Sequence, residues 1–115
     1  MKIKNIFLTL LIAFMSMSML AQKSKTVTTT FWVAGICGMC EETIEKAMDV
    51  RGVISADYAL ATNNLTVTYK PTKISEDKIH KLLNAVGYDT EKSTCTEAQY
   101  NLVHDCCRYR EQEKH

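Results

Sequence analysis

Hydrophobic and polar positions alternate along three segments of the chain, residues 26–33, 54–60 and 65–70. A period of two is typical of half-buried β-strands, and the Thr, Val and aromatic content of these segments favours the same structure. Residues 62–64, Thr-Asn-Asn, separate the second and third segments, and Asn tolerates the left-handed backbone of a tight turn. The pattern therefore predicts one separate strand and one β-hairpin.

Two other segments have the spacing of amphipathic helices. The first begins near Cys40 and ends at Gly52, and the second follows an expected N-cap at Ser75 and ends at Gly87. Their apolar positions are Ile44, Ala47 and Met48 in the first helix, and Ile79, Leu82, Leu83 and Val86 in the second. A short fourth strand is predicted over 88–92, and a partly helical tail over 96–110.

This order of elements predicts an α+β fold. With right-handed crossovers, it gives a ferredoxin-like βαββαβ sandwich with both helices on one face of an antiparallel sheet and an extra C-terminal helical tail. We expect the tail to cover the open face at Trp32, using Leu102 and Val103, and to return Cys106 or Cys107 to the end of the sheet that carries Cys37.

The N-terminal segment has a different composition. Two lysines, Lys2 and Lys4, precede an apolar run from residue 6 to 20, and Ala21 precedes a polar stretch. This is typical of a secretory signal peptide covering residues 1–21, since the run is short for a bilayer span. We therefore expect an exported protein, periplasmic or secreted, with no membrane insertion after cleavage.

Cleavage would leave 12 basic and 13 acidic residues, because the 14 Lys and Arg lose Lys2 and Lys4 while the 13 Asp and Glu are kept. A net charge near −1 argues against a nucleic-acid partner. All five cysteines lie in the mature part, at positions 37, 40, 95, 106 and 107. An odd number leaves one thiol unpaired within a monomer, so a disulfide scaffold does not account for the whole set.

The candidate chemistry lies at the junction of the first strand and first helix, in Cys37-Gly38-Met39-Cys40. This spacing lets two sulfurs bind one small ion, and a helix N-terminus stabilises the thiolate of Cys40. Thiolates select soft ions, so we expect Cu(I), with Hg(II) sharing the same geometry. Zn(II) prefers about four ligands, and no carboxylate directly precedes Cys37.

The main alternative is a thiol–disulfide oxidoreductase that uses the same two cysteines. The order of elements argues against it, since a thioredoxin fold needs a strand preceded by proline, whereas Pro71 leads directly into a helix. A structural disulfide between Cys37 and Cys40 is a third reading, disfavoured because so small a ring constrains little of the unfolded chain. No other catalytic constellation stands out, so we do not expect an enzyme.

Residues 27–90 resemble the heavy-metal-associated domain, a family that includes copper chaperones, modules of metal-transporting ATPases and the periplasmic mercury-binding protein. The matching pieces are Ala34-Gly35-Ile36-Cys37-Gly38-Met39-Cys40, Arg51-Gly52-Val53 and Val86-Gly87-Tyr88-Asp89. The resemblance implies metal ligands at Cys37 and Cys40 and a residue beside the site at Tyr88. The family usually reads Gly-Met-x-Cys-x-x-Cys, so Gly35-Ile36-Cys37 either is one residue short or lacks the Met. The family Met packs under the loop, and we expect Ile36 to replace it there.

The resemblance completes the expected organisation, with a signal peptide over 1–21, a heavy-metal-associated domain over 22–92 and a Cys-containing tail over 93–115. The expected function is a metal carrier or scavenger that exchanges its ion with a metal transporter or another metal-binding protein. His104, Cys106 and Cys107 are candidate auxiliary ligands, and a disulfide from Cys95 to Cys106 or Cys107 is the alternative for the tail. His80, between polar neighbours, is expected at the surface.

Overall fold

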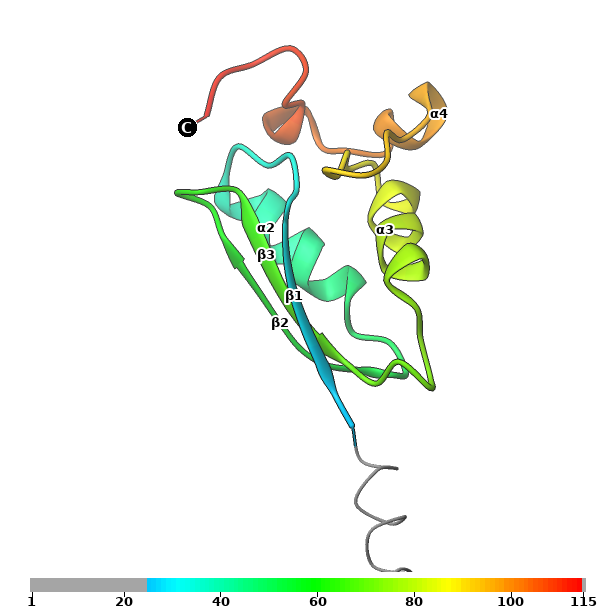
Figure 1. Cartoon of the computed structure of the whole chain (residues 1–115). Helices are drawn as coiled ribbons and strands as arrows, with labels where there is room; N and C mark the ends of the chain where they lie inside the picture. The colour runs from blue at the N-terminus through cyan, green and yellow to red at the C-terminus, as the bar shows by residue number, and fades with distance from the viewer. Residues whose placement is uncertain (1–24, 115) are drawn as a thin grey trace, which may run out of the picture.

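The computed structural model describes residues 25–114 (Figure 1). Its elements are β1 (Val27–Trp32), α2 (Gly38–Ala47), β2 (Val53–Ala59), β3 (Asn64–Tyr69), α3 (Glu76–Ala85), the short α4 (Glu97–Tyr100) and the 3₁₀ helix η1 (Asp105–Cys107). The predicted signal peptide lies outside the described residues. Within 25–114, no helix is both long and apolar enough to cross a bilayer.

The three strands form an antiparallel sheet in the order β1-β3-β2, with α2 and α3 on one side of it (Figure 1). Thr30 pairs with Thr66, and Leu65 pairs with Tyr58. The alternating pattern places one set of strand residues in the core, and Phe31, Leu65 and Val67 are buried there. The buried residues that the helices contribute are Ile44, Met48, Ile79 and Leu83. The ferredoxin-like α+β prediction is confirmed.

The predicted ends of α3 and the predicted hairpin turn agree with the backbone, whereas α2 ends at Ala47, before the predicted end at Gly52. The Ser75 hydroxyl accepts a hydrogen bond from the Lys78 N–H at 3.1 Å, which is the expected N-cap of α3. Gly52 and Gly87 have φ of 101° and 100°, a region that favours glycine. Asn63 has φ of 63° in the turn of the β2–β3 hairpin, as its residue type predicted.

The fourth strand is shorter than predicted. Within residues 25–114, its ladder pairing is a single isolated bridge between Thr90 and Val33, the residue after β1. Hydrogen bonds from Ala34 N–H to Asp89 O and from Glu91 N–H to Trp32 O flank this bridge. The Thr90 N–H then donates to the Ser93 carbonyl at 2.8 Å, which turns the chain back. Cys95 therefore starts the tail near the end of the sheet that carries Cys37, so the tail does not need to return along the sheet to reach that end.

His80 is buried, contrary to the prediction of a surface residue. Its side chain is 3% exposed, its Nδ1 lies 2.6 Å from the Thr90 hydroxyl, and its ring lies 4.1 Å from the ring of Phe31. The segment after α3 thus covers the side of α3 that carries His80. The polar residues near His80 in the sequence had suggested that this side faces solvent.

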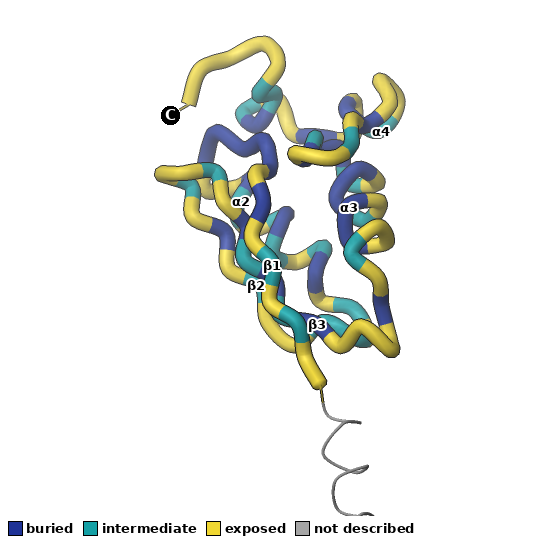
Figure 2. The backbone as a smooth tube through the Cα atoms, viewed as in Figure 1, coloured by how far each residue is buried: buried dark blue, intermediate teal, exposed yellow. Residues whose placement is uncertain are grey.

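The tail takes a different path from the one predicted. Trp32 on the open sheet face is 42% exposed and Leu102 is 69% exposed, so the tail does not cover that face. Instead it crosses the end of the sheet above the loop between β1 and α2 (Figure 1). Figure 2 shows buried segments of loop and tail facing each other there. Val103 is buried, and Gly87 leaves it room because a Cβ on Gly87 would collide with the Val103 side chain.

Candidate metal centre

The loop between β1 and α2 is held by a buried tyrosine. The Tyr58 hydroxyl donates to the Val33 carbonyl at 2.7 Å and accepts from the Asn63 amide at 2.9 Å. That amide also donates to the Gly35 carbonyl at 2.7 Å. A Cβ on Gly35 would lie 2.5 Å from the Tyr58 oxygen, so glycine is needed for this close approach. Ile36 is buried beneath the loop, as expected.

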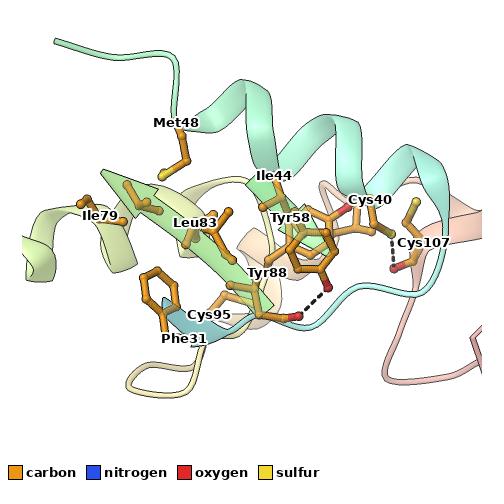
Figure 3. Packing of buried hydrophobic residues seen from close by; sticks show 14 of the residues in the cluster. Phe31, Cys40, Ile44, Met48, Tyr58, Ile79, Leu83, Tyr88, Cys95 and Cys107 are labelled. Carbon is orange, nitrogen blue, oxygen red and sulfur yellow. Dashed lines mark hydrogen bonds between the residues drawn. The ribbon is translucent and has the colours of Figure 1, made fainter. Parts of the chain in front are cut away.

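The loop and the tail together bring three sulfurs to one point. Cys37 is the N-cap of α2, and its Sγ lies 3.4 Å from the Sγ of Cys40 in the first turn. The Sγ of Cys107, from η1, lies 2.8 Å from that of Cys37. The three sulfurs lie within 4.8 Å of one another, as donors around a single ion do. Figure 3 shows Cys40 and Cys107 side by side.

The three cysteines of the cluster are buried. The exposed fractions are 7% for Cys37, 0% for Cys40 and 1% for Cys107. The tail causes this burial, since Cys107 and the residues around it lie over the loop. An isolated domain that ended at residue 92 would lack this cover.

The Cys37 thiol ionises more readily than an ordinary cysteine. Burial acts to raise the pKa of its thiol, but hydrogen bonds with the Cys107 side chain and the Cys40 N–H outweigh burial and lower the pKa to about 7. Burial raises the pKa of the Cys107 thiol, and the sulfurs of Cys37 and Cys40 raise it further. The Cys107 thiol therefore donates to the Cys37 thiolate, and an incoming ion would displace that proton.

The donor set fits a soft ion. Thiolates favour Cu(I) and other soft metals, while carboxylate and water ligands favour hard ones. Among the described residues, the group that could hold a metal consists of these three cysteines, without a carboxylate or an imidazole.

Comparison with known proteins agrees with this chemistry. The family model for the heavy-metal-associated domain matches residues 30–89, more than half of the chain. The chain belongs to the heavy-metal-associated domain family.

Two curated relatives of this heavy-metal-associated domain are much longer proteins. The chain is 37% identical over 71 residues to a zinc-transporting ATPase of Synechocystis sp.. The matched region covers 60% of this chain and 10% of the ATPase. The chain is 36% identical over 56 residues to a copper-exporting P-type ATPase of Staphylococcus saprophyticus, covering 48% and 7% respectively. The chain thus spans a tenth or less of the length of these two relatives.

A solved structure is similar over nearly its whole length. The CopZ metallochaperone has a TM-score of 0.53 and 29% identity, covering 56% of this chain and 98% of that one. The heavy-metal-associated domain therefore occurs both in transporters and as a separate carrier.

The other predicted ligands of this heavy-metal-associated domain lie outside the cluster. The Cys106 sulfur is 3.7 Å from that of Cys107 and 3.3 Å from the Met39 sulfur at the half-exposed edge of the site. His104 is exposed, and its backbone carbonyl accepts the Cys107 N–H. Cys95 lies against Tyr109 and Arg110, and the structure joins none of the five cysteines in a disulfide.

Sequence reasoning missed the residues that fix the tail. The Tyr109 hydroxyl donates to the Gly87 carbonyl at 2.7 Å and accepts from the Asp89 N–H at 3.1 Å. Arg110 binds the Asp89 carboxylate through Nη2 and Nε at 2.9 and 3.2 Å, and its guanidinium lies 4.5 Å from the centre of the Tyr100 ring. We call the contacts of Tyr109 and Arg110 with Gly87 and Asp89 the latch. No spacing in the sequence pairs these residues.

Tyr88 lies beside the sulfurs, where the family resemblance placed it. It is 2% exposed, and its ring stacks on that of Tyr109 with the centroids 5.7 Å apart. Burial raises the pKa of its hydroxyl, and interactions with the sulfurs of Cys40 and Cys107 raise it further. The hydroxyl therefore stays protonated beside these sulfurs.

We expect Tyr88→Phe to speed up transfer of bound Cu(I) to a competing chelator about tenfold. The variant removes the hydroxyl that interacts with the sulfurs, and a polar interaction with a charged group contributes about 1.5–3 kcal/mol. The variant keeps the buried ring, whereas Tyr88→Ala would cost about 3–5 kcal/mol in folding. Tyr69→Phe is the control, because Tyr69 is buried opposite Val27, at the other end of β1. Equal transfer rates in Tyr88→Phe and wild type would contradict this role.

Proposed function

We propose that this chain is an exported carrier or scavenger of a soft metal ion, with Cu(I) as its main cargo. Cys37 and Cys40 bind the ion, and thiolate ligand exchange passes it on. The observation that carries the proposal is the pair of buried sulfurs 3.4 Å apart at the start of α2.

The choice of Cu(I) rests on the donors. Two buried sulfurs at a helix N-terminus suit a soft ion of low coordination number, which Cu(I) and Hg(II) share. Zn(II) would need more ligands than this loop offers. One long relative is a zinc-transporting and another a copper-exporting ATPase, so zinc is the competitor to test.

Export rests on residues 1–21, whose basic start, apolar run and terminal Ala21 are typical of a signal peptide. The proposed partners are a metal transporter or another metal-binding protein, since heavy-metal-associated domains occur in such proteins. Thiolate exchange suits such transfers, because the acceptor offers the same kind of ligand as the donor.

The oxidoreductase alternative finds no support in the geometry. A reactive cysteine of that class needs a partly exposed thiolate that a substrate disulfide can reach. Cys37 is 7% exposed and Cys40 is fully buried, and the tail lies over both.

Competitive titration tests the proposal. Residues 22–115, purified reduced and without oxygen, are titrated with Cu(I), Hg(II) and Zn(II) in competition. We expect one Cu(I) per chain, displaced by Hg(II) but not by Zn(II), because thiolates prefer the softer ions. Zn(II) retained against excess Cu(I), or the absence of any bound metal, would overturn the assignment.

A further inference from the structure

The tail supplies a sulfur that the metal-binding loop does not contain. Cys107 lies 70 positions from Cys37 in the sequence, yet their sulfurs are 2.8 Å apart. The three sulfurs span at most 4.8 Å. At a metal–sulfur distance of about 2.3 Å, as in zinc–thiolate bonds, three sulfurs around one ion lie about 4 Å apart. Small side-chain shifts would therefore form a trigonal site.

The tail is fixed on both sides of the cluster. The latch ties it to the segment after α3, where Tyr109 bonds Gly87 and Arg110 bonds Asp89. On the other side, the Lys114 ammonium donates to the Leu60 carbonyl at 2.6 Å in the β2–β3 turn. Both attachments follow Cys107 in the chain, and together they hold its segment over the loop.

Burial distinguishes Cys107 from its neighbour. The Cys107 sulfur is enclosed with those of Cys37 and Cys40, whereas Cys106 is half-exposed and its sulfur contacts the Met39 thioether. Two adjacent cysteines thus occupy different environments, and only one belongs to the three-sulfur group.

We propose that Cys107 is a third ligand, so that the soft ion is held in a closed three-thiolate centre formed by the loop and the tail. This inference rests on the proposed function. A two-coordinate ion accepts an incoming thiolate directly, but here the third position is already filled from within the chain. Transfer to a partner therefore requires the tail to move away first, and the centre favours retention of the ion.

X-ray absorption on the Cu(I)-loaded mature protein tests this directly. We expect three sulfur neighbours in wild type, two in Cys107→Ser and Cys107→Ala, and three in the control Cys106→Ser. We also expect the Cys107 variants to lose Cu(I) to a competing chelator at least tenfold more readily than Cys106→Ser. Circular dichroism checks that each variant is folded.

Two sulfur neighbours in the wild-type protein would overturn the third ligand and leave the proposed function intact. So would three sulfur neighbours in a folded Cys107 variant. A wild-type protein that binds no Cu(I) under reducing conditions would instead refute the proposed function itself. A count of five free thiols in the apo protein before loading confirms that Cys37 and Cys107 are not joined in a disulfide.

Discussion

The mature protein with Cys37→Ser and Cys40→Ser together is expected to bind Cu(I) about 10⁴-fold more weakly than wild type. Structural zinc sites with four ligands bind with about 10–16 kcal/mol, or about 3 kcal/mol per ligand, so losing two ligands costs about 6 kcal/mol. Serine nearly preserves the side-chain shape, which keeps the loop in place. Chelator competition with the reduced protein measures the change.

Cys95→Ser is the matched control for this double variant. Cys95 is also a buried cysteine of the same protein, but its sulfur lies against Tyr109 and Arg110. The Cys95→Ser variant should therefore bind Cu(I) as tightly as wild type does. If the double variant held Cu(I) as tightly as Cys95→Ser, the ligands would have to be other residues.

Local sequence patterns predicted the elements that depend on local contacts. The alternation around Thr62-Asn63-Asn64 identified the hairpin, and Ser75 identified the start of α3. Cys37 and Cys40 could be paired from their spacing alone, because a helix start brings sulfurs three residues apart together. These features need no knowledge of the rest of the chain.

Contacts between distant segments were not predictable in this way. His80 follows polar neighbours on α3, so its periodicity gave no sign that Thr90 and Phe31 would bury it. The length of the fourth strand was predicted wrongly for a related reason. The Thr90 hydroxyl accepts a hydrogen bond from the Ser93 N–H, and this contact favours a turn over an extended strand.

In the tail, the candidate ligands could be predicted from the sequence, but the path of the chain could not. Its cysteines were recognised as candidate ligands from their residue type, and the structure places Cys107 at the loop. The predicted path was wrong, because the spacing of Leu102, Val103 and Cys106 suggested a helix, whereas the chain forms the short α4 and η1 with a bend between them. The latch residues that set this path are joined only by tertiary contacts.

The latch is expected to control access to the cysteines, and Arg110→Ala should release it. Arg110 donates to both oxygens of Asp89 and to the Cys95 carbonyl. Asp89 is 19% exposed, so the variant leaves a largely buried carboxylate without its cation. We expect a loss of about 1–3 kcal/mol in folding stability and about tenfold faster alkylation of Cys37 and Cys40 in the apo protein.

Arg108→Ala is the control, since Arg108 lies in the same tail but pairs with Asp105, which is 98% exposed. An ion pair whose carboxylate is almost fully exposed contributes about 0–1 kcal/mol, so alkylation should stay near the wild-type rate. Equal rates in the two variants would show that the Arg110 contact does not hold the tail closed.

The pH dependence of stability gives an independent measure of the same contact. Burial acts to raise the pKa of Asp89, but hydrogen bonds from Arg110 and the Cys95 N–H outweigh it and lower the pKa below its ordinary value. The carboxylate therefore contributes stability above that ordinary value, near 3.8, and the contribution is lost as the pH falls through the lower pKa of the folded protein. Arg110→Ala should lose less stability than wild type between neutral pH and this acidic range, because much of the contribution is already absent. Urea unfolding of both proteins across the range measures the difference, and parallel stability curves would rule out Arg110 as the source of the lowered pKa.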